Sequence, residues 1–374
     1  MFTGLPFLPA DLLLPKPDHL PLFPVIACDQ HTAEPDYWAR ADALVGDAPG
    51  ALRLILPEAH LNRDVSVAIT GIHAAMKQYL AADIFQKYPG AIVYVERSDS
   101  LGNLRRGLVG VVDLEAYEFT PDSSAPIRAT EETVPARIPP RAAVRRGAAL
   151  ETSHVMLLCD DVQRSVIEPL TAQVGQMEPL YDVALMLGGG HLRGWLLGED
   201  QLAQVSEALR ALQAQSPLLF AVGDGNHSLA TAKTLYAEQP DNPAARFAMC
   251  ELVNLYDESL SFEPIHRVVF GVDKTHLLTT YQDKFCENQP PLPILQNFLD
   301  DYTGKHGGEI DYIHGDETAQ RLGERPDAVV FLCKVIPKEE LFSTVVTHGV
   351  LPRKSFSMGH GDDKRFYLEC RAII

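Results

Sequence analysis

The clearest pattern in the chain is an apolar run that leads through a glycine-containing turn into a helical repeat. Residues 218–222 are uninterruptedly apolar, which is typical of a short buried strand. The turn that follows, residues 223–228, reads Gly-Asp-Gly-Asn-His-Ser. Leu229, Ala232 and Leu235 then recur at the spacing of one helix face. The pattern therefore predicts a strand, a turn and a helix start in direct succession.

The remaining apolar and polar positions predict a mixture of strands and helices. Helices are expected over 64–86, with Asp64 as the N-cap, and over 292–302. Strands are expected at 52–56, 91–95, 108–113, 154–159, 328–333 and 342–347, and a hairpin at 183–187 and 192–197. The proline- and arginine-rich segment 120–147 is predicted to be irregular. Strands and helices without regular alternation predict an α+β or mixed α/β fold, with mixed sheets and flanking helices.

The length of 374 residues is sufficient for two or three domains. We expect an N-terminal α/β domain over 1–150, a central domain over 151–270 that holds the 223–228 turn, and a C-terminal α/β region over 271–374 that packs on the others. No apolar run approaches the length of a membrane span, and prolines interrupt an N-terminus that has no basic region. A cytoplasmic protein without membrane contact is the expectation.

Charge and cysteine content exclude several classes of function. The net charge of −18 disfavours nucleic-acid binding, which needs lysine and arginine against phosphates. Six scattered cysteines without a Cys-x-x-Cys pair argue against a zinc ribbon, a disulfide framework or a dithiol site. Segment 97–146 differs from the rest, because its eight arginines outnumber its seven acidic residues. A locally basic segment can attract a small anionic ligand.

The 223–228 turn has two interpretations that spacing alone leaves open. The first N–H groups of a helix lack partners within the helix and carry partial positive charge, so they bind anions such as phosphate. Asp224, Asn226, His227 and Ser228 add acid–base, amide and hydroxyl groups at the same place. The same residues are also typical of an ordinary turn with a capped helix.

An ordered set of motifs resembles a known family over nearly the whole chain. The motifs are Ala27–Thr32, Leu54–Glu58, Ile127–Thr133, Val222–Ser228, Pro264–Arg267 and Pro352–Ser355. Together they resemble the bacterial and archaeal family known as domain of unknown function 1015. Most members carry an Asp-Gly-His-His-Arg loop that is similar to the phosphate-contacting loop of the ParB/sulfiredoxin-like superfamily, which includes free-serine kinases. The resemblance implies a ParB/sulfiredoxin-like element around the Asp-Gly-Asn-His turn.

The match in this loop is partial. Asp224, Gly225 and His227 occupy the family positions, whereas Asn226 replaces the first histidine and Ser228 replaces the arginine. The lost positive charge has to come from elsewhere, and Arg128 and Arg267 are the candidates. Sulfiredoxin chemistry is not expected, because it needs a cysteine in the loop.

The resemblance implies a small-molecule phosphotransferase, an ATP-dependent kinase (with ATP or ADP as the nucleotide) acting on free serine or a similar hydroxylated metabolite with Mg²⁺. In this interpretation Asp224 binds Mg²⁺ or orients His227, which donates to a phosphate oxygen. Gly225, Asn226 and Ser228 bind the nucleotide. The general base is Asp29 or Glu58, and the sequence does not choose between them.

Further candidates lie elsewhere in the chain. Arg128 with Glu131 is suited to the carboxylate and amine of a substrate, because a guanidinium grips a carboxylate through two hydrogen bonds. His266 and Arg267 are further substrate-binding candidates, and Lys354 and Ser355 are candidates for phosphate contact. The alternative is a non-catalytic nucleotide-binding or regulatory protein, which the departures at 226 and 228 favour. The partners expected are a nucleotide and a small molecule, and a homodimer stays open.

Overall fold

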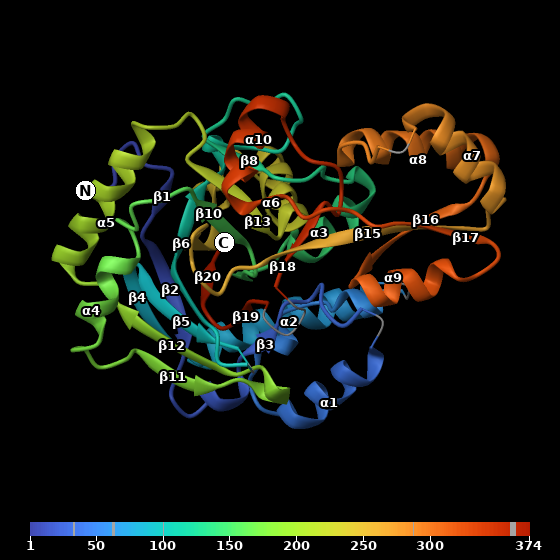
Figure 1. Cartoon of the computed structure of the whole chain (residues 1–374). Helices are drawn as coiled ribbons and strands as arrows, with labels where there is room; N and C mark the ends of the chain where they lie inside the picture. The colour runs from blue at the N-terminus through green and yellow to red at the C-terminus, as the bar shows by residue number, and fades with distance from the viewer. Residues whose placement is uncertain (33, 62–63, 100, 287, 360–363) are drawn as a thin grey trace. The chain divides into compact units, whose positions relative to one another are not determined.

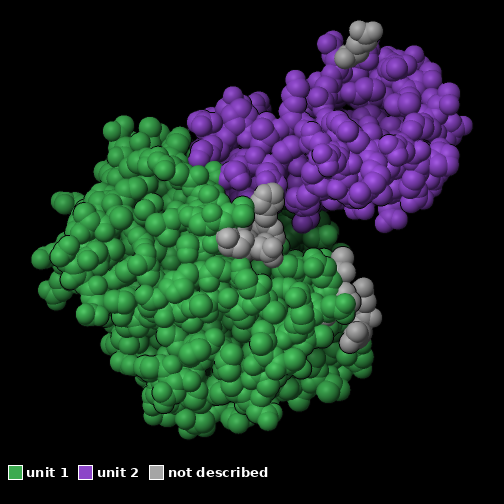
Figure 2. Space-filling view, turned by 60° about the horizontal axis from the view of Figure 1, so that its bottom comes forward, with its two compact units in different colours: residues 1–260, 360–374 green, residues 261–359 purple. Residues whose placement is uncertain are grey.

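A computed structural model describes residues 1–32, 34–61, 64–99, 101–286, 288–359 and 364–374. The chain divides into two compact units (Figure 2). Unit 1 comprises residues 1–260 and 360–374, and unit 2 comprises residues 261–359. Compactness does not show which segments fold independently, so the three-part division expected from the sequence stays a prediction.

A ten-stranded mixed sheet is the centre of unit 1 (Figure 1). Its order is β11-β12-β5-β6-β14-β10-β13-β8-β7, with β1 paired on β6. The strands are β1 (Phe7–Leu8), β5 (Val93–Ser98), β6 (Leu104–Asp113), β7 (Tyr117–Glu118), β8 (Ile127–Ala129), β10 (Met156–Cys159), β11 (Tyr181–Ala184), β12 (His191–Leu196), β13 (Phe220–Asp224) and β14 (Phe247–Asn254). The pairs β10–β14, β8–β13 and β7–β8 are parallel, and the other pairs are antiparallel. The mixed α/β fold class is confirmed.

Apolar side chains line both faces of this sheet, because successive strand residues point to opposite sides. Val93 and Val95 belong to one core, with buried residues of helices α1 and α2, whereas Tyr94 belongs to the other core, with residues of α4, α5 and α6. The helices of unit 1 are α1 (Pro35–Val45), α2 (Ser66–Ala81), α3 (Ile138–Arg145), α4 (Glu168–Val174), α5 (Glu199–Gln213) and α6 (Asn226–Glu238). The sheet is thus covered on both faces (Figure 1).

The end of the chain is built into unit 1 next to its beginning. One smaller sheet has the order β4-β2-β20-β9, and β3 pairs with β19. These strands are β2 (Ala10–Pro15), β3 (Val25–Ile26), β4 (Phe85–Ala91), β9 (Leu150–Thr152), β19 (Phe366–Tyr367) and β20 (Cys370–Ala372). Residues 366–372 are therefore held by strand pairing to segments more than two hundred positions earlier.

Unit 2 is an antiparallel sheet with helices of its own. Strand β15 (Phe262–Phe270) pairs with each of the other strands found in the described part of the unit. The further elements are α7 (Lys274–Phe285), α8 (Leu292–His306), β16 (Glu309–His314), α9 (Asp316–Gly323), β17 (Ala328–Phe331), α10 (Leu341–His348) and β18 (Phe356–Met358). Leu277, Leu295 and Leu299 pack against Val269 and Val329 in its core.

Four expectations about local structure were wrong. Helix α2 begins at Ser66 with Val65 as its N-cap instead of Asp64, and residues 85–86, expected at its end, belong to strand β4. Residues 52–56 form a 3₁₀ turn at Ala51–Arg53 and a buried loop instead of a strand. The β-branched run 342–347 lies in helix α10, where packing of one apolar face outweighs the strand propensity of these residues. Segment 120–147 is not irregular throughout, because it contains β8 and α3. The prolines at the start of α3 are tolerated there, since the first N–H groups of a helix have no intrahelical partner.

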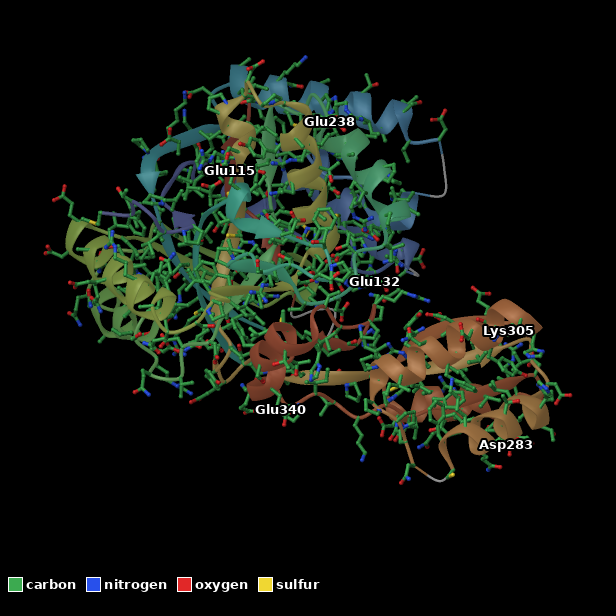
Figure 3. All side chains as sticks on the ribbon, turned by 90° about the horizontal axis from the view of Figure 1, so that it is seen from above. Glu115, Glu132, Glu238, Asp283, Lys305 and Glu340 are labelled. Carbon is green, nitrogen blue, oxygen red and sulfur yellow. The ribbon has the colours of Figure 1, made fainter. Side chains whose placement is uncertain are left out.

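Exposed acidic side chains are in keeping with the acidic composition. Glu115, Glu132 and Glu238 of unit 1 are exposed and are labelled in Figure 3. Among the described residues, none of the helices combines the length and apolar character needed to cross a bilayer.

A network of buried ion pairs fixes the C-terminal segment within unit 1. Arg365 contacts Glu251 of β14 at 2.5 Å and Glu369 at 2.6 Å, and its Nε donates to the Ser153 carbonyl. Arg105 of β6 lies 3.1 Å from the other side of Glu251. Burial alone would raise the pKa of the Glu251 carboxyl, but the two guanidinium groups outweigh it and lower the pKa to about 2.

We expect the substitution Glu251→Gln to destabilise the protein by about 3 kcal/mol at pH 7, because it leaves buried guanidinium groups without a full countercharge. A carboxyl whose pKa is lowered on folding contributes stability that is present above the unfolded pKa and is lost as the pH falls through the folded value. The contribution of Glu251 should thus fade between pH 4.5 and about pH 2. Denaturant unfolding of the wild type and of Glu251→Gln along this pH range tests the prediction. An identical pH dependence of the two unfolding free energies would contradict it.

Candidate functional site

The predicted strand, turn and helix start are present as β13 and α6. Gly225 lies between them with φ +79°, in the left-handed region that glycine adopts without strain. A Cβ atom at this position would lie 3.0 Å from the Val155 Cα atom. No side chain caps the start of α6, and the buried Asn226 Oδ1 atom has no hydrogen-bond partner among the described residues. The phosphate-binding role expected for the start of α6 stays a prediction, because the absence of a side-chain cap fits both interpretations of this turn.

Asp224 lies next to a lysine from the far end of the chain. Its Oδ2 atom is 3.3 Å from Lys364 Nζ, and its Oδ1 atom accepts the Gly225 N–H. Both side chains are largely buried, with exposed fractions of 17% and 12%. A cation thus lies beside the start of α6, although the family arginine is absent from the loop.

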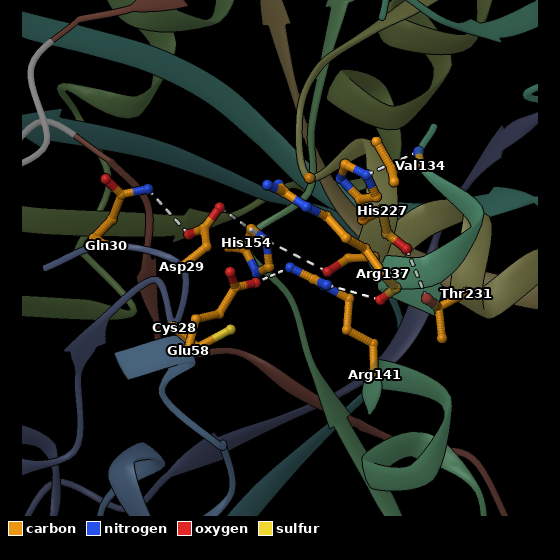
Figure 4. Close-up of polar contacts among 12 residues, drawn as sticks. Cys28, Asp29, Gln30, Glu58, Val134, Arg137, Arg141, His154, His227 and Thr231 are labelled. Carbon is orange, nitrogen blue, oxygen red and sulfur yellow. Dashed lines mark hydrogen bonds and ion pairs between the residues drawn. The ribbon is translucent and has the colours of Figure 1, made fainter. Parts of the chain in front are cut away.

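His154 is the centre of a polar chain that sequence analysis did not identify (Figure 4). Its Nε2 atom is 3.4 Å from Ser228 Oγ and 3.8 Å from an Asp29 carboxylate oxygen. Its Nδ1 atom is 2.6 Å from the Tyr367 hydroxyl. Three segments distant in sequence, at residues 28–29, 154 and 228, therefore meet here with Tyr367 of the C-terminal segment.

Cys28 completes this chain but is not a reactive thiolate. The Tyr367 hydroxyl donates to Cys28 Sγ at 3.2 Å and accepts the Cys28 N–H. Burial, together with the negative charge of Asp29, raises the pKa of the Cys28 thiol to about 12. The thiol therefore stays protonated at neutral pH, and the thiolate is the reactive form of cysteine.

Glu58 lies on the neighbouring segment, joined to Cys28 by a backbone hydrogen bond of 2.7 Å. Its carboxylate is paired with Arg141 of α3, whose other terminal nitrogen donates to the Arg137 carbonyl (Figure 4). An ion-paired carboxylate is a weaker base than an unpaired one, because the adjacent cation favours its charged form.

A cavity of about 150 Å³ lies in unit 1 beside these groups. Its polar wall includes His154, Ser228, Glu58 and Arg141, while leucine, methionine and valine side chains from residues 54–61, 76, 144 and 150 form much of the rest. An apolar cavity of this size holds a molecule about as large as benzene. The space therefore suits a small metabolite, with its polar groups on one side.

His227 of the turn is held by the segment before α3. Its Nε2 atom accepts the Val134 N–H at 3.2 Å, and its backbone carbonyl accepts the Thr231 hydroxyl (Figure 4). Because Nε2 is already an acceptor, any donation from this ring to a phosphate has to come from Nδ1.

Arg128 is buried in β8, and its Nε atom donates to the Ala125 carbonyl. Glu131 lies two residues beyond the end of that strand. Neither residue is part of the cavity wall described above. Their substrate-binding roles remain a prediction, and the arginines that line the cavity are Arg141 and Arg145.

The remaining candidates belong to unit 2. The Arg267 guanidinium donates to the backbone carbonyls of Arg353 and Lys354 and to the Gln296 side chain. Ser355 Oγ donates to the Pro352 carbonyl. The two motifs that carry these residues therefore meet, but their groups hold the fold of unit 2 together.

His266 is almost completely buried in the same unit. One of its ring nitrogens lies 2.9 Å from Asp316, and the other accepts the Cys333 N–H. The substrate and phosphate roles expected for His266, Arg267, Lys354 and Ser355 remain predictions.

The chain matches the sequence pattern of one described family, DUF1015, a protein of unknown function, over residues 7–372. The chain belongs to this family. The resemblance seen in the ordered motifs is therefore confirmed. No curated protein matches the chain significantly.

Several solved structures are distantly similar. A free serine kinase in complex with AMP is 11% identical, with 68% of this chain and 89% of that chain covered and a TM-score of 0.41. A conserved hypothetical protein from Pyrococcus furiosus is 12% identical, with 67% and 90% covered and a TM-score of 0.38. SbnI with a C-terminal truncation, from Staphylococcus aureus, is 10% identical, with 67% and 82% covered and a TM-score of 0.36. Similarity this low carries no argument about the ligand or the reaction of this family member.

Substitution of Gly225 by alanine should destabilise the protein by about 1–3 kcal/mol, because alanine at φ +79° is strained and its Cβ would press on the Val155 backbone. The matched control is Gly198→Ala at the start of α5, where φ is −81° and the nearest atom is at 3.6 Å. Thermal unfolding of the two variants tests this, and equal melting temperatures would contradict the assigned geometry.

Proposed function

We propose that this chain is a small-molecule phosphotransferase, an ATP-dependent kinase of free serine or a similar hydroxylated metabolite. One observation carries the proposal. Ser228, in the first turn of α6, is part of the wall of a small cavity that also contains His154, Glu58 and Arg141. This lining supports the proposal, in which the start of α6 binds the phosphate and the neighbouring polar groups move a proton beside the space for a small acceptor.

The start of α6 supplies the phosphate site in this proposal. Phosphoryl transfer depends mainly on positioning and on neutralising charge around the transferred group. The N–H groups of Asn226–Ser228 contact the phosphate oxygens, aided by the positive end of the helix dipole. We assign the missing arginine charge to Lys364, which turns from Asp224 to the phosphate when the nucleotide binds. Arg128 and Arg267, the candidates from sequence, are both engaged with backbone carbonyls.

Mg²⁺ fits this site only in part. Among the described residues there is no group of three or more acidic, histidine or cysteine side chains suited to a metal. Mg²⁺ bound to a nucleotide commonly takes one or two carboxylates and completes its shell with phosphates and water. Asp224 is the residue that would hold it, and the ion would neutralise charge on the transferring phosphate.

The acceptor occupies the cavity with its hydroxyl towards His154. We assign proton removal to His154, with Asp29 at 3.8 Å stabilising the imidazolium that forms. Of the two carboxylates suggested by the sequence, Glu58 is paired with Arg141 and is assigned to holding the acceptor. An amino acid could exchange into this ion pair, with its ammonium on Glu58 and its carboxylate on Arg141.

The second candidate is a non-catalytic nucleotide-binding or regulatory protein. The observation in its favour is the pair of loop departures, Asn226 and Ser228, at positions where the family usually has histidine and arginine. Binding without turnover is the property that separates it from the kinase.

ATP or ADP with Mg²⁺ at millimolar concentration should raise the melting temperature, because a ligand bound only by the folded state stabilises that state. Lys364→Ala should weaken nucleotide binding by about tenfold or more, since a hydrogen bond to a charged group contributes about 1.5–3 kcal/mol. The matched control is Lys16→Ala, which removes the lysine of an exposed ion pair with Asp83 in the same unit. Titration calorimetry measures both affinities, and equal affinities would remove Lys364 from the site.

Nucleotide consumption with a panel of hydroxylated amino acids and sugars tests turnover. Asp224→Ala should stay folded and lose turnover. Nucleotide binding without consumption for every acceptor selects the regulatory alternative. No nucleotide binding at all ends the proposal.

A further inference from the structure

Ser228 has the surroundings of an activated nucleophile. Its hydroxyl is part of the cavity wall and lies 3.4 Å from His154 Nε2. A nucleophile, a base within reach and a third group that orients the base form the usual arrangement of covalent catalysis. Here the third group is Tyr367, whose hydroxyl is 2.6 Å from the other ring nitrogen of His154.

The hydrogen bonds around Tyr367 are compatible with a proton on Nδ1 of His154. The Tyr367 hydroxyl has one proton, which can go to Cys28 Sγ at 3.2 Å. Its oxygen, 2.6 Å from His154 Nδ1, can then accept a hydrogen bond from that nitrogen. The proposal below uses this tautomer, in which Nε2 presents its lone pair to Ser228.

The electrostatic surroundings favour loss of the serine proton. Asp29 lies 3.8 Å from His154 Nε2 and stabilises a positive imidazole ring. Ser228 is the third residue of α6, where the helix dipole stabilises negative charge. His154 is only 6% exposed, so water competes weakly for its lone pair.

We propose that Ser228 is a covalent nucleophile, activated by His154. The identity of the group that Ser228 accepts, a phosphoryl group, rests on the proposed function. In the first step the bond between the γ-phosphorus and the bridging oxygen of the nucleotide breaks, and a bond from Ser228 Oγ to phosphorus forms. The serine proton passes to His154 Nε2 and from there to solvent, and the nucleoside diphosphate leaves.

The second step regenerates the serine. The acceptor hydroxyl attacks the phosphorus, His154 takes the proton of that hydroxyl, and the same proton moves to Ser228 Oγ as its bond to phosphorus breaks. The sum is one phosphoryl group transferred and one proton released. The family arginine at this position could not act in this way, so the step is a property of chains that carry a serine here.

A fluorophosphonate probe tests the nucleophile without any assumption about the substrate. It reacts when Ser228 Oγ displaces fluoride from phosphorus, again with loss of the serine proton to His154. We expect one label, mapped to Ser228 by peptide mass spectrometry in the full chain. Labelling should vanish in Ser228→Ala and fall by about a hundredfold or more in His154→Gln. The matched control, Thr234→Val, removes a hydroxyl of the same helix that donates to the Ala230 carbonyl and should label like the wild type.

Tyr367→Phe provides a second variant should His154→Gln fail to fold. It keeps the base but removes the group that orients it, so labelling should slow and its pH profile should shift. A folded wild-type chain that is not labelled at Ser228, or a folded His154→Gln variant that is labelled at the wild-type rate, overturns the proposal.

Two further experiments separate the hypothesis of a serine nucleophile from the hypothesis of a phosphotransferase. Incubation with ATP and Mg²⁺ without acceptor should give phosphoserine at position 228. If nucleotide is consumed normally by Ser228→Ala, the phosphotransferase stands and the covalent step is overturned. If the probe labels Ser228 but no acceptor leads to nucleotide consumption, the nucleophile stands and the phosphotransferase falls.

Discussion

The candidate site depends on the buried contact between Arg365 and Glu251. Arg365 also binds Glu369 and the Ser153 carbonyl, so one guanidinium joins the C-terminal segment to β14 and to the residue before His154. A buried ion pair contributes less net stability than its Coulomb energy suggests, because both charges lose their water. Its geometric effect is large, since a planar guanidinium with several fixed acceptors tolerates little displacement. Gly107 shows how closely the strands are fitted around this pair, because a Cβ there would lie 2.7 Å from a Glu251 oxygen.

This anchor explains how residues from both ends of the chain reach one place. Lys364 precedes Arg365 directly, and Tyr367 follows it in β19, paired with β3. With Arg365 fixed, Lys364 reaches Asp224 and Tyr367 reaches His154. The position of the lysine charge and the orientation of the histidine ring therefore have the same structural cause. In the proposed mechanism, a change in the C-terminal segment would disturb phosphate binding and proton transfer together.

The sequence was a good guide to what is local and a poor guide to what is brought together by folding. The β13–α6 turn is evident in the chain because apolar periodicity and glycine act over a few residues. The sequence marked His154 only as the first residue of a predicted strand. It marked Arg141 only as one of the arginines of a basic segment. Tyr367 carried no local signal, since its role comes from pairing across more than three hundred positions. Arg267 was conspicuous in its motif, yet its guanidinium serves the backbone of unit 2.

The departures from the family loop are best understood together with the groups that surround them. Replacing an arginine by Ser228 removes a cation from the start of α6, and Lys364 lies where it can restore that charge. An arginine at position 228 would also place a cation beside His154 Nε2, which would disfavour the protonated ring that proton transfer requires. A serine adds no charge there, and in the Nδ1-protonated tautomer of His154 its hydroxyl can donate to Nε2. In the proposed mechanism, the substitution thus changes the electrostatic role of the position from binding charge to moving a proton.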